Sequence, residues 1–113
     1  MGKQYKAIFL LPLESRKRLT EYGWEFDSQN KISSDVTFHL LGMLKMVFLK
    51  SRNSIDYYEG KDIEALIFKS EVGEGIESIY FKLYGGSASQ IAGVLSGSGY
   101  DGMLEIFDPD AID

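Results

Sequence analysis

Apolar positions along the chain form patterns that predict several strands. Residues 5–11 are almost continuously apolar, which is typical of a strand covered on both faces. Residues 76–84 alternate between apolar and polar side chains and predict a half-buried strand. Residues 62–69 predict a neighbouring strand, because the glycines of the loop 70–75 allow the two to form a hairpin.

The longest helical pattern covers residues 35–50. Its apolar side chains recur at helical spacing and spread far around the cylinder, and Ser33 or Ser34 is placed to cap the first turn. One helix is hard to cover completely in a small domain. We therefore expect either a helix enclosed by the domain itself or a helix that gives one face to a second copy or another partner.

Shorter patterns complete the prediction of the fold. Helices are expected over 14–22 and 87–95, short strands over 24–26 and 103–107, and a polar loop over 27–34. Together the patterns predict an α+β fold: a single domain with a largely antiparallel sheet and one long helix packed on a face.

Composition restricts the chemistry and the number of cores. A chain of 113 residues with 44% hydrophobic residues builds one core, so residues 1–113 are expected to form one domain. The absence of cysteine excludes disulfides, thiolate metal sites and sulfur nucleophiles. The apolar run at 7–11 is too short for a signal-peptide core or for a membrane span of roughly 20 residues. We expect a cytoplasmic protein without a membrane partner.

Charge is divided unevenly along the chain. The net charge is −5, with a balance of +4 in residues 1–54 and −9 in residues 55–113. A negative field repels phosphate backbones and speeds encounter with basic proteins, so no nucleic acid partner is expected for the acidic half. The alternative is that these acids only keep a small domain soluble.

The most acidic stretch, residues 56–77, has seven acids against two lysines and includes a pair of tyrosines. Tyrosine is enriched in interface hot spots, and the surrounding acids would pair with Lys or Arg of a basic partner. Tyrosines that only border a sheet are the other explanation. The predicted partner-binding residues are Asp56, Tyr57, Tyr58, Glu59, Asp62, Glu71, Glu74 and Glu77.

Catalytic and metal-binding patterns are weak. His39 is the only histidine, so a two-histidine acid–base mechanism is excluded, and no metal site or cofactor is predicted. The segment Gly85–Gln90 follows a predicted strand and precedes a predicted helix, where backbone N–H groups can bind an anion. It lacks the residues of a P-loop and the glycine spacing of a dinucleotide fingerprint, so a simple turn is favoured.

These features favour a protein-binding inhibitor over an enzyme. By analogy of composition, the chain is expected to act as an immunity-type protein that neutralises a basic toxin or nuclease through its acidic, tyrosine-containing surface. One alternative is a small ligand-binding or enzymatic domain that uses the Gly85–Gln90 turn and His39. A further alternative is a subunit of a homo- or hetero-oligomer, with a homodimer formed through helix 35–50.

Overall fold

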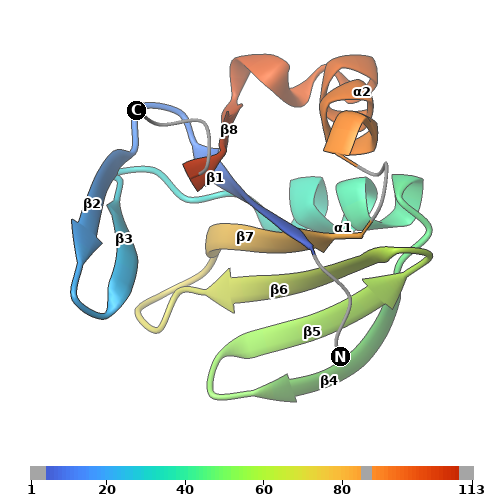
Figure 1. The fold of residues 1–113 in the computed structure, drawn as a ribbon. Coiled ribbons are helices and arrows are strands. Elements are labelled where there is room, and N and C mark those ends of the chain that lie inside the picture. The colour runs from blue at the N-terminus through green and yellow to red at the C-terminus, as the bar shows by residue number, and fades with distance from the viewer. Residues whose placement is uncertain (1–4, 85–87, 110–113) are drawn as a thin grey trace.

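A six-stranded antiparallel sheet forms the centre of the protein (Figure 1). The structure is a computed structural model that describes residues 5–84 and 88–109. Strands that follow one another from β4 to β7 are neighbours, and β1 lies between β7 and β8. The strands of this sheet are β1 (Lys6–Pro12), β4 (Val47–Arg52), β5 (Ile55–Gly60), β6 (Ile63–Lys69), β7 (Ile76–Leu83) and β8 (Leu104–Phe107).

Two short helices cover one face of the sheet. They are α1 (Ser34–Met43) and α2 (Ala88–Ser98), followed by a 3₁₀ turn, η1 (Tyr100–Gly102). The core lies between helices and sheet, and its central side chains come from alternate positions of the strands, as the pleat requires. Phe81 on β7 and Ala65 on β6 are among the least exposed. The hydroxyl of Ser33 accepts a hydrogen bond of 3.1 Å from Val36 N–H and caps α1 as expected.

A two-stranded hairpin, β2 (Arg16–Thr20) and β3 (Gly23–Asp27), lies against the opposite face of the sheet (Figure 1). Aromatic rings join the two layers. The centroid of the Phe9 ring on β1 lies 4.8 Å from that of Phe26 on β3, and the Trp24 ring meets Phe107 of β8 edge-on, also at 4.8 Å. This contact leaves the far end of the hairpin exposed, with Tyr22 in its turn.

The prediction of a helix over 14–22 is wrong, because β2 occupies most of this segment. Its residues favour helix by intrinsic propensity, but that preference is weak and tertiary contacts override it. Leu19 pairs with Trp24 and Lys17 with Phe26, so forming β2 gives the aromatic strand β3 its hydrogen-bonded neighbour. The short strand predicted over 24–26 is confirmed as β3.

The prediction of one long helix over 35–50 is also wrong. The helix ends at Met43, and Lys45 takes a left-handed backbone conformation with φ of 56°. β4 then begins at Val47, where β-branched and aromatic side chains suit a strand. The two helices have 10 and 11 residues. A compact α+β domain with an antiparallel sheet is confirmed without the long helix.

The remaining elements follow the predictions with one exception. The strands predicted over 5–11, 62–69 and 76–84 are confirmed, as are the later helix and the last strand. Residues 56–59, for which no helix or strand was predicted, form most of β5, which pairs with β6 along its whole length. Within the described part of the chain, no helix combines the length and the apolar character needed to cross a membrane.

Candidate functional site

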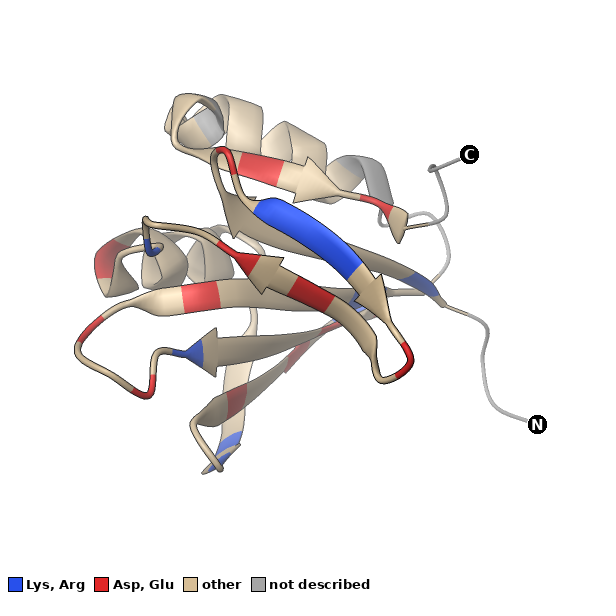
Figure 2. Ribbon diagram, turned by 90° about the vertical axis from the view of Figure 1, so that its left-hand side faces the viewer, with Lys and Arg blue, Asp and Glu red and all other residues tan. Residues whose placement is uncertain are grey.

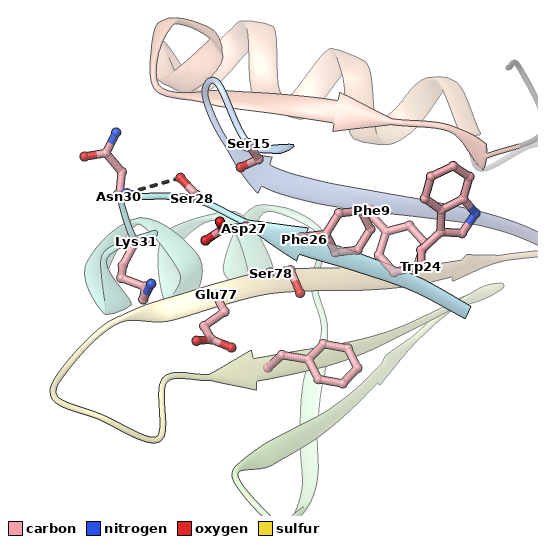
Figure 3. Close-up of a pocket in the computed structure, with 11 residues that line it drawn as sticks. Phe9, Ser15, Trp24, Phe26, Asp27, Ser28, Asn30, Lys31, Glu77 and Ser78 are labelled. Carbon is pink, nitrogen blue, oxygen red and sulfur yellow. Dashed lines mark hydrogen bonds between the residues drawn. The ribbon is translucent and has the colours of Figure 1, made fainter. Parts of the chain in front are cut away.

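A pocket of about 260 Å³ lies between the hairpin and the face of the sheet opposite the helices (Figure 3). We call it the hairpin pocket. Aromatic side chains from β1, β3 and β6 form its apolar wall. The polar residues come from β3, the segment after it, the start of β7 and the turn between β1 and β2. Its lining consists of Phe9, Ser15, Trp24, Phe26, Asp27, Ser28, Asn30, Lys31, Phe68, Glu77 and Ser78.

Backbone contacts hold the two polar edges of the pocket together. Ile32 and Ile76 exchange two hydrogen bonds of 2.8 Å, which place the segment after β3 beside the start of β7. Gly75 has a φ of +107°, and a Cβ there would lie 2.8 Å from Cβ of Lys31. Glycine therefore permits both the turn and the close approach of the two segments.

Two buried serines line the hairpin pocket and differ in their hydrogen bonding. Ser15 and Ser78 are both 7% exposed. The Ser15 hydroxyl donates a hydrogen bond of 2.6 Å to the carbonyl of Pro12. Ser78 Oγ has no hydrogen-bond partner among the described residues, and its side chain faces the pocket. The fully buried side-chain oxygens without a hydrogen bond among the described residues are Asp56 Oδ1 and Glu105 Oε1, so Ser78 Oγ itself reaches the pocket space, where water or a bound group can contact it.

The charged groups of the hairpin pocket are also without ion pairs. Asp27 and Glu77 are exposed, and neither carboxylate forms an ion pair with a described residue; the same holds for the ammonium group of Lys31. Figure 3 shows Lys31 at the end of the pocket away from Trp24. Two carboxylates against one ammonium make the lining negative.

The eight residues predicted to bind a partner do not share one surface. Glu77 lines the hairpin pocket, and Glu71 and Glu74 are exposed in the adjoining loop between β6 and β7. We call these three residues together with Asp27 the acidic end. Viewed from the hairpin side, acidic segments appear on β3, on β7 and on this loop (Figure 2).

The other five predicted residues lie along β5 and just after it. Asp56 is paired with Lys69 at 3.0 Å and its side chain is 14% exposed. Tyr58 packs against the core on the helix face, whereas Tyr57 points to the opposite face. The remaining two, Glu59 and Asp62, are exposed at the end of β5 remote from the acidic end. Alternation along a strand therefore separates residues that are adjacent in sequence.

Three tyrosines of the sheet have raised pKa values. Burial raises the pKa of Tyr58 and raises that of Tyr80 to about 12. The Tyr84 hydroxyl donates a hydrogen bond to Glu64, which raises the pKa of this tyrosine. All three phenols are therefore protonated near neutral pH, and a raised pKa does not favour them as general bases.

His39 and the Gly85–Gln90 segment are the residues named for the enzymatic alternative, and their position relative to the hairpin pocket bears on it. His39 is exposed on α1, and its Nδ1 lies 2.7 Å from the Tyr100 hydroxyl of η1. Residues 85–87 of the Gly85–Gln90 segment lie outside the described residues, and Gln90 is exposed on α2. Neither His39 nor Gln90 lines the hairpin pocket. Among described residues, no group of three or more histidines and carboxylates is arranged to hold a metal ion.

Sequence reasoning missed Asp27, Ser78 and the aromatic wall of the hairpin pocket. The alternation of Trp24 and Phe26 with acidic residues was visible, but its partner strand was assigned to a helix. A search for two adjacent short strands joined at Gly23 could have found the hairpin. Comparisons of this chain with protein-family models, with curated proteins and with solved structures find no match.

Proposed function

We propose that this protein is an inhibitor of the immunity type, which binds a basic toxin or nuclease through the acidic end and the hairpin pocket. The observation that carries the proposal is the juxtaposition of carboxylates without ion pairs and a pocket with an aromatic wall. Elsewhere in the described structure, Lys6, Lys17 and Lys69 each pair with a carboxylate. The acidic end therefore keeps its charge for a partner.

Binding would proceed in two physical stages. The negative charge of the acidic end attracts a basic surface and raises the rate of encounter. Aromatic side chains of the hairpin pocket are then buried, and the carboxylates accept hydrogen bonds from Lys or Arg of the partner. On a nuclease, these carboxylates would take the positions of substrate phosphates, so inhibition would be competitive.

The test is capture with immobilised protein from the source cell lysate, at low and at high salt. We expect a basic protein that is retained at low salt and released at high salt. A bait with Glu74→Gln and Glu77→Gln should lose it, whereas a matched bait with Glu21→Gln and Glu59→Gln, both exposed and away from the pocket, should retain it. Equal retention by both baits, or recovery of the bait alone, would contradict the proposal.

A second candidate function is self-association through β4, and the exposure of its apolar residues favours it. β4 is an edge of the sheet, and Val47, Phe48 and Leu49 are 63%, 51% and 50% exposed. These residues belong to the segment for which a dimer helix was expected. An exposed apolar edge strand is a template for pairing with another chain.

The sequence of β4 is compatible with pairing to itself. In a regular two-fold antiparallel pair centred on Phe48, Val47 of one copy would lie opposite Leu49 of the other, and the register shift of β4 between Phe48 and Lys50 would have to straighten for this pairing. The apolar side chains then face each other, and Lys50 of one copy does not oppose Lys50 of the other, which would be unfavourable. This arrangement would join two sheets into one across a symmetric interface.

A further inference from the structure

We propose that the hairpin pocket is a site for the guanidinium group of an arginine side chain on the basic partner. This inference rests on the proposed function, and it names the chemical group that the pocket accepts. A volume of about 260 Å³ lies just below the range of small-molecule sites, which begins at roughly 300 Å³, so it suits the end of one side chain.

The walls of the pocket match the two kinds of surface of a guanidinium. Phe9, Trp24, Phe26 and Phe68 supply aromatic surface, on which a planar, weakly hydrated cation stacks by cation–π attraction. Asp27 and Glu77 supply carboxylate oxygens around the same space. Guanidinium carries five N–H donors in a fixed fork, and carboxylates accept them in pairs.

Ser78 is the independent observation that points to a ligand. It is 7% exposed, lines the pocket and has no hydrogen-bond partner among the residues described. Its hydroxyl can accept one N–H of a guanidinium that is also held by Glu77, the residue before it on β7. Both adjacent side chains line the pocket because Glu77 lies at a register shift, where Ser78 pairs with Phe68 and Ile76 pairs with Lys69. Ser15, with the same exposure, is already bonded to the backbone and is not needed for binding.

An arginine fits this set of groups better than a lysine does. An ammonium is strongly hydrated and compact, so it gains less from the aromatic wall and satisfies fewer acceptors at once. A free carboxylate or phosphate would meet two carboxylates and a single ammonium, Lys31, at one end of the pocket. Within the lining the balance is one negative charge, which favours a cation, and Arg16, the cross-strand partner of Asp27, lies outside the lining.

Trp24 provides the readout, because it is the only tryptophan of the chain and lines the pocket. The intact protein is titrated with N-acetylarginine amide, with its lysine counterpart and with the neutral citrulline counterpart, and Trp24 fluorescence is recorded. We expect a saturable change with the arginine probe, a weaker effect with lysine and none with citrulline. No saturable change with arginine, or an equal one with citrulline, would overturn the proposal.

Variants connect the signal to the proposed groups. Glu77→Gln and Asp27→Asn should each weaken arginine binding about tenfold, the effect of losing one charge-assisted contact. Ser78→Ala should weaken it several-fold, whereas Ser15→Ala and Glu59→Gln should leave it unchanged. Near-ultraviolet circular dichroism checks that each variant is folded. Unchanged affinity in correctly folded Glu77→Gln and Asp27→Asn would contradict the assignment.

A comparison with free arginine separates the two sources of a guanidinium. If the guanidinium belongs to a protein side chain, the blocked probe should bind at least as well as free arginine. Free arginine binding more than tenfold tighter, with the preference lost in Lys31→Met, would assign the pocket to a small guanidino compound and overturn the protein source. If arginine binds but no basic protein is captured, the pocket assignment is supported and the inhibitor function fails. If a basic protein is captured but arginine does not bind, the inhibitor function is supported and the pocket assignment fails.

Discussion

Lys17 Nζ lies 2.7 Å from Glu105 Oε1, and this ion pair joins the hairpin to the edge strand β8. Its geometry is that of an ion pair without a directed hydrogen bond. Both side chains are about one quarter exposed, and Lys17 also donates a hydrogen bond to the Ser15 carbonyl. The contact stands beside the aromatic cluster around Phe107, so charge and apolar packing act on the same interface.

Removing the lysine of this pair should destabilise the protein. We expect Lys17→Ala to lower the free energy of unfolding by about 1–2 kcal/mol, because Glu105 is left partly buried without its partner. Arg18→Ala is the control, since Arg18 and Glu25 are 3.5 Å apart and 76% and 53% exposed. Its effect should be below about 0.5 kcal/mol. Urea unfolding followed by Trp24 fluorescence measures both, and equal losses would refute the distinction.

Tyr80 should make the protein sensitive to alkali. Burial and the neighbouring Tyr5 raise the pKa of Tyr80 from the ordinary 10.0 to about 12. The folded state therefore retains this proton while the unfolded state loses it, and the stabilising contribution, complete below pH 10, disappears as the pH rises towards 12.

The matched variants are Tyr80→Phe and Tyr22→Phe, of which Tyr22 is 91% exposed in the hairpin turn. Melting temperatures measured from pH 9 to pH 12 should fall less steeply in Tyr80→Phe than in the wild type, and Tyr22→Phe should follow the wild type. A titration of phenolate absorbance gives the fraction ionised in each protein. If the melting temperatures of the wild type and both variants fall in parallel with pH, Tyr80 makes no contribution to the sensitivity to alkali.

The turn between β4 and β5 can be improved. Asn53 and Ser54 have φ values of 53° and 64°, the left-handed pair of a two-residue hairpin turn in which Asn-Gly is favoured. Ser54→Gly should raise the free energy of unfolding by about 0.5–1 kcal/mol, because a Cβ is disfavoured in this region. Ser54→Ala keeps the Cβ and should give no gain in denaturant unfolding. A similar gain from alanine would show that removal of the hydroxyl is responsible.

A charged substitution in β4 tests whether the protein self-associates through this strand. Leu49→Lys should abolish concentration-dependent dimerisation in sedimentation experiments, because each copy would then bring a charge into the strand pair. Val72→Lys, at a loop position that is 88% exposed, adds the same charge away from the edge and should leave dimerisation unchanged. A wild-type protein that is monomeric at every concentration would eliminate this candidate.

The sheet strands were predictable because burial leaves its own pattern in the sequence. β1 is covered by helices on one face and by the hairpin on the other, hence its continuous apolar run. β7 alternates because part of its second face meets solvent. Residues 47–49 were misassigned because three consecutive apolar residues fit a buried helix and a strand equally well.

The candidate site was less predictable because its groups come from distant parts of the chain. Glu77 was selected for its acidic surroundings, yet Asp56 and Tyr58, from the same stretch, face the helices. Asp27 lies in the site because the backbone pairing of Ile32 with Ile76 places the segment after β3 beside the start of β7. Such pairing depends on which strands become neighbours, and local charge patterns carry no information about that.

The sequence by itself determined the central strands, the α+β class and the acidity of the second half, since these follow from local spacing and composition. Only the tertiary structure decided that residues 16–20 form a strand, that residues 47–52 form an edge, and that Asp27, Glu77 and Ser78 line one pocket. The physical reason is that a side chain's face follows from alternation along its strand, whereas its neighbours follow from strand pairing, and pairing is set by burial of the whole core.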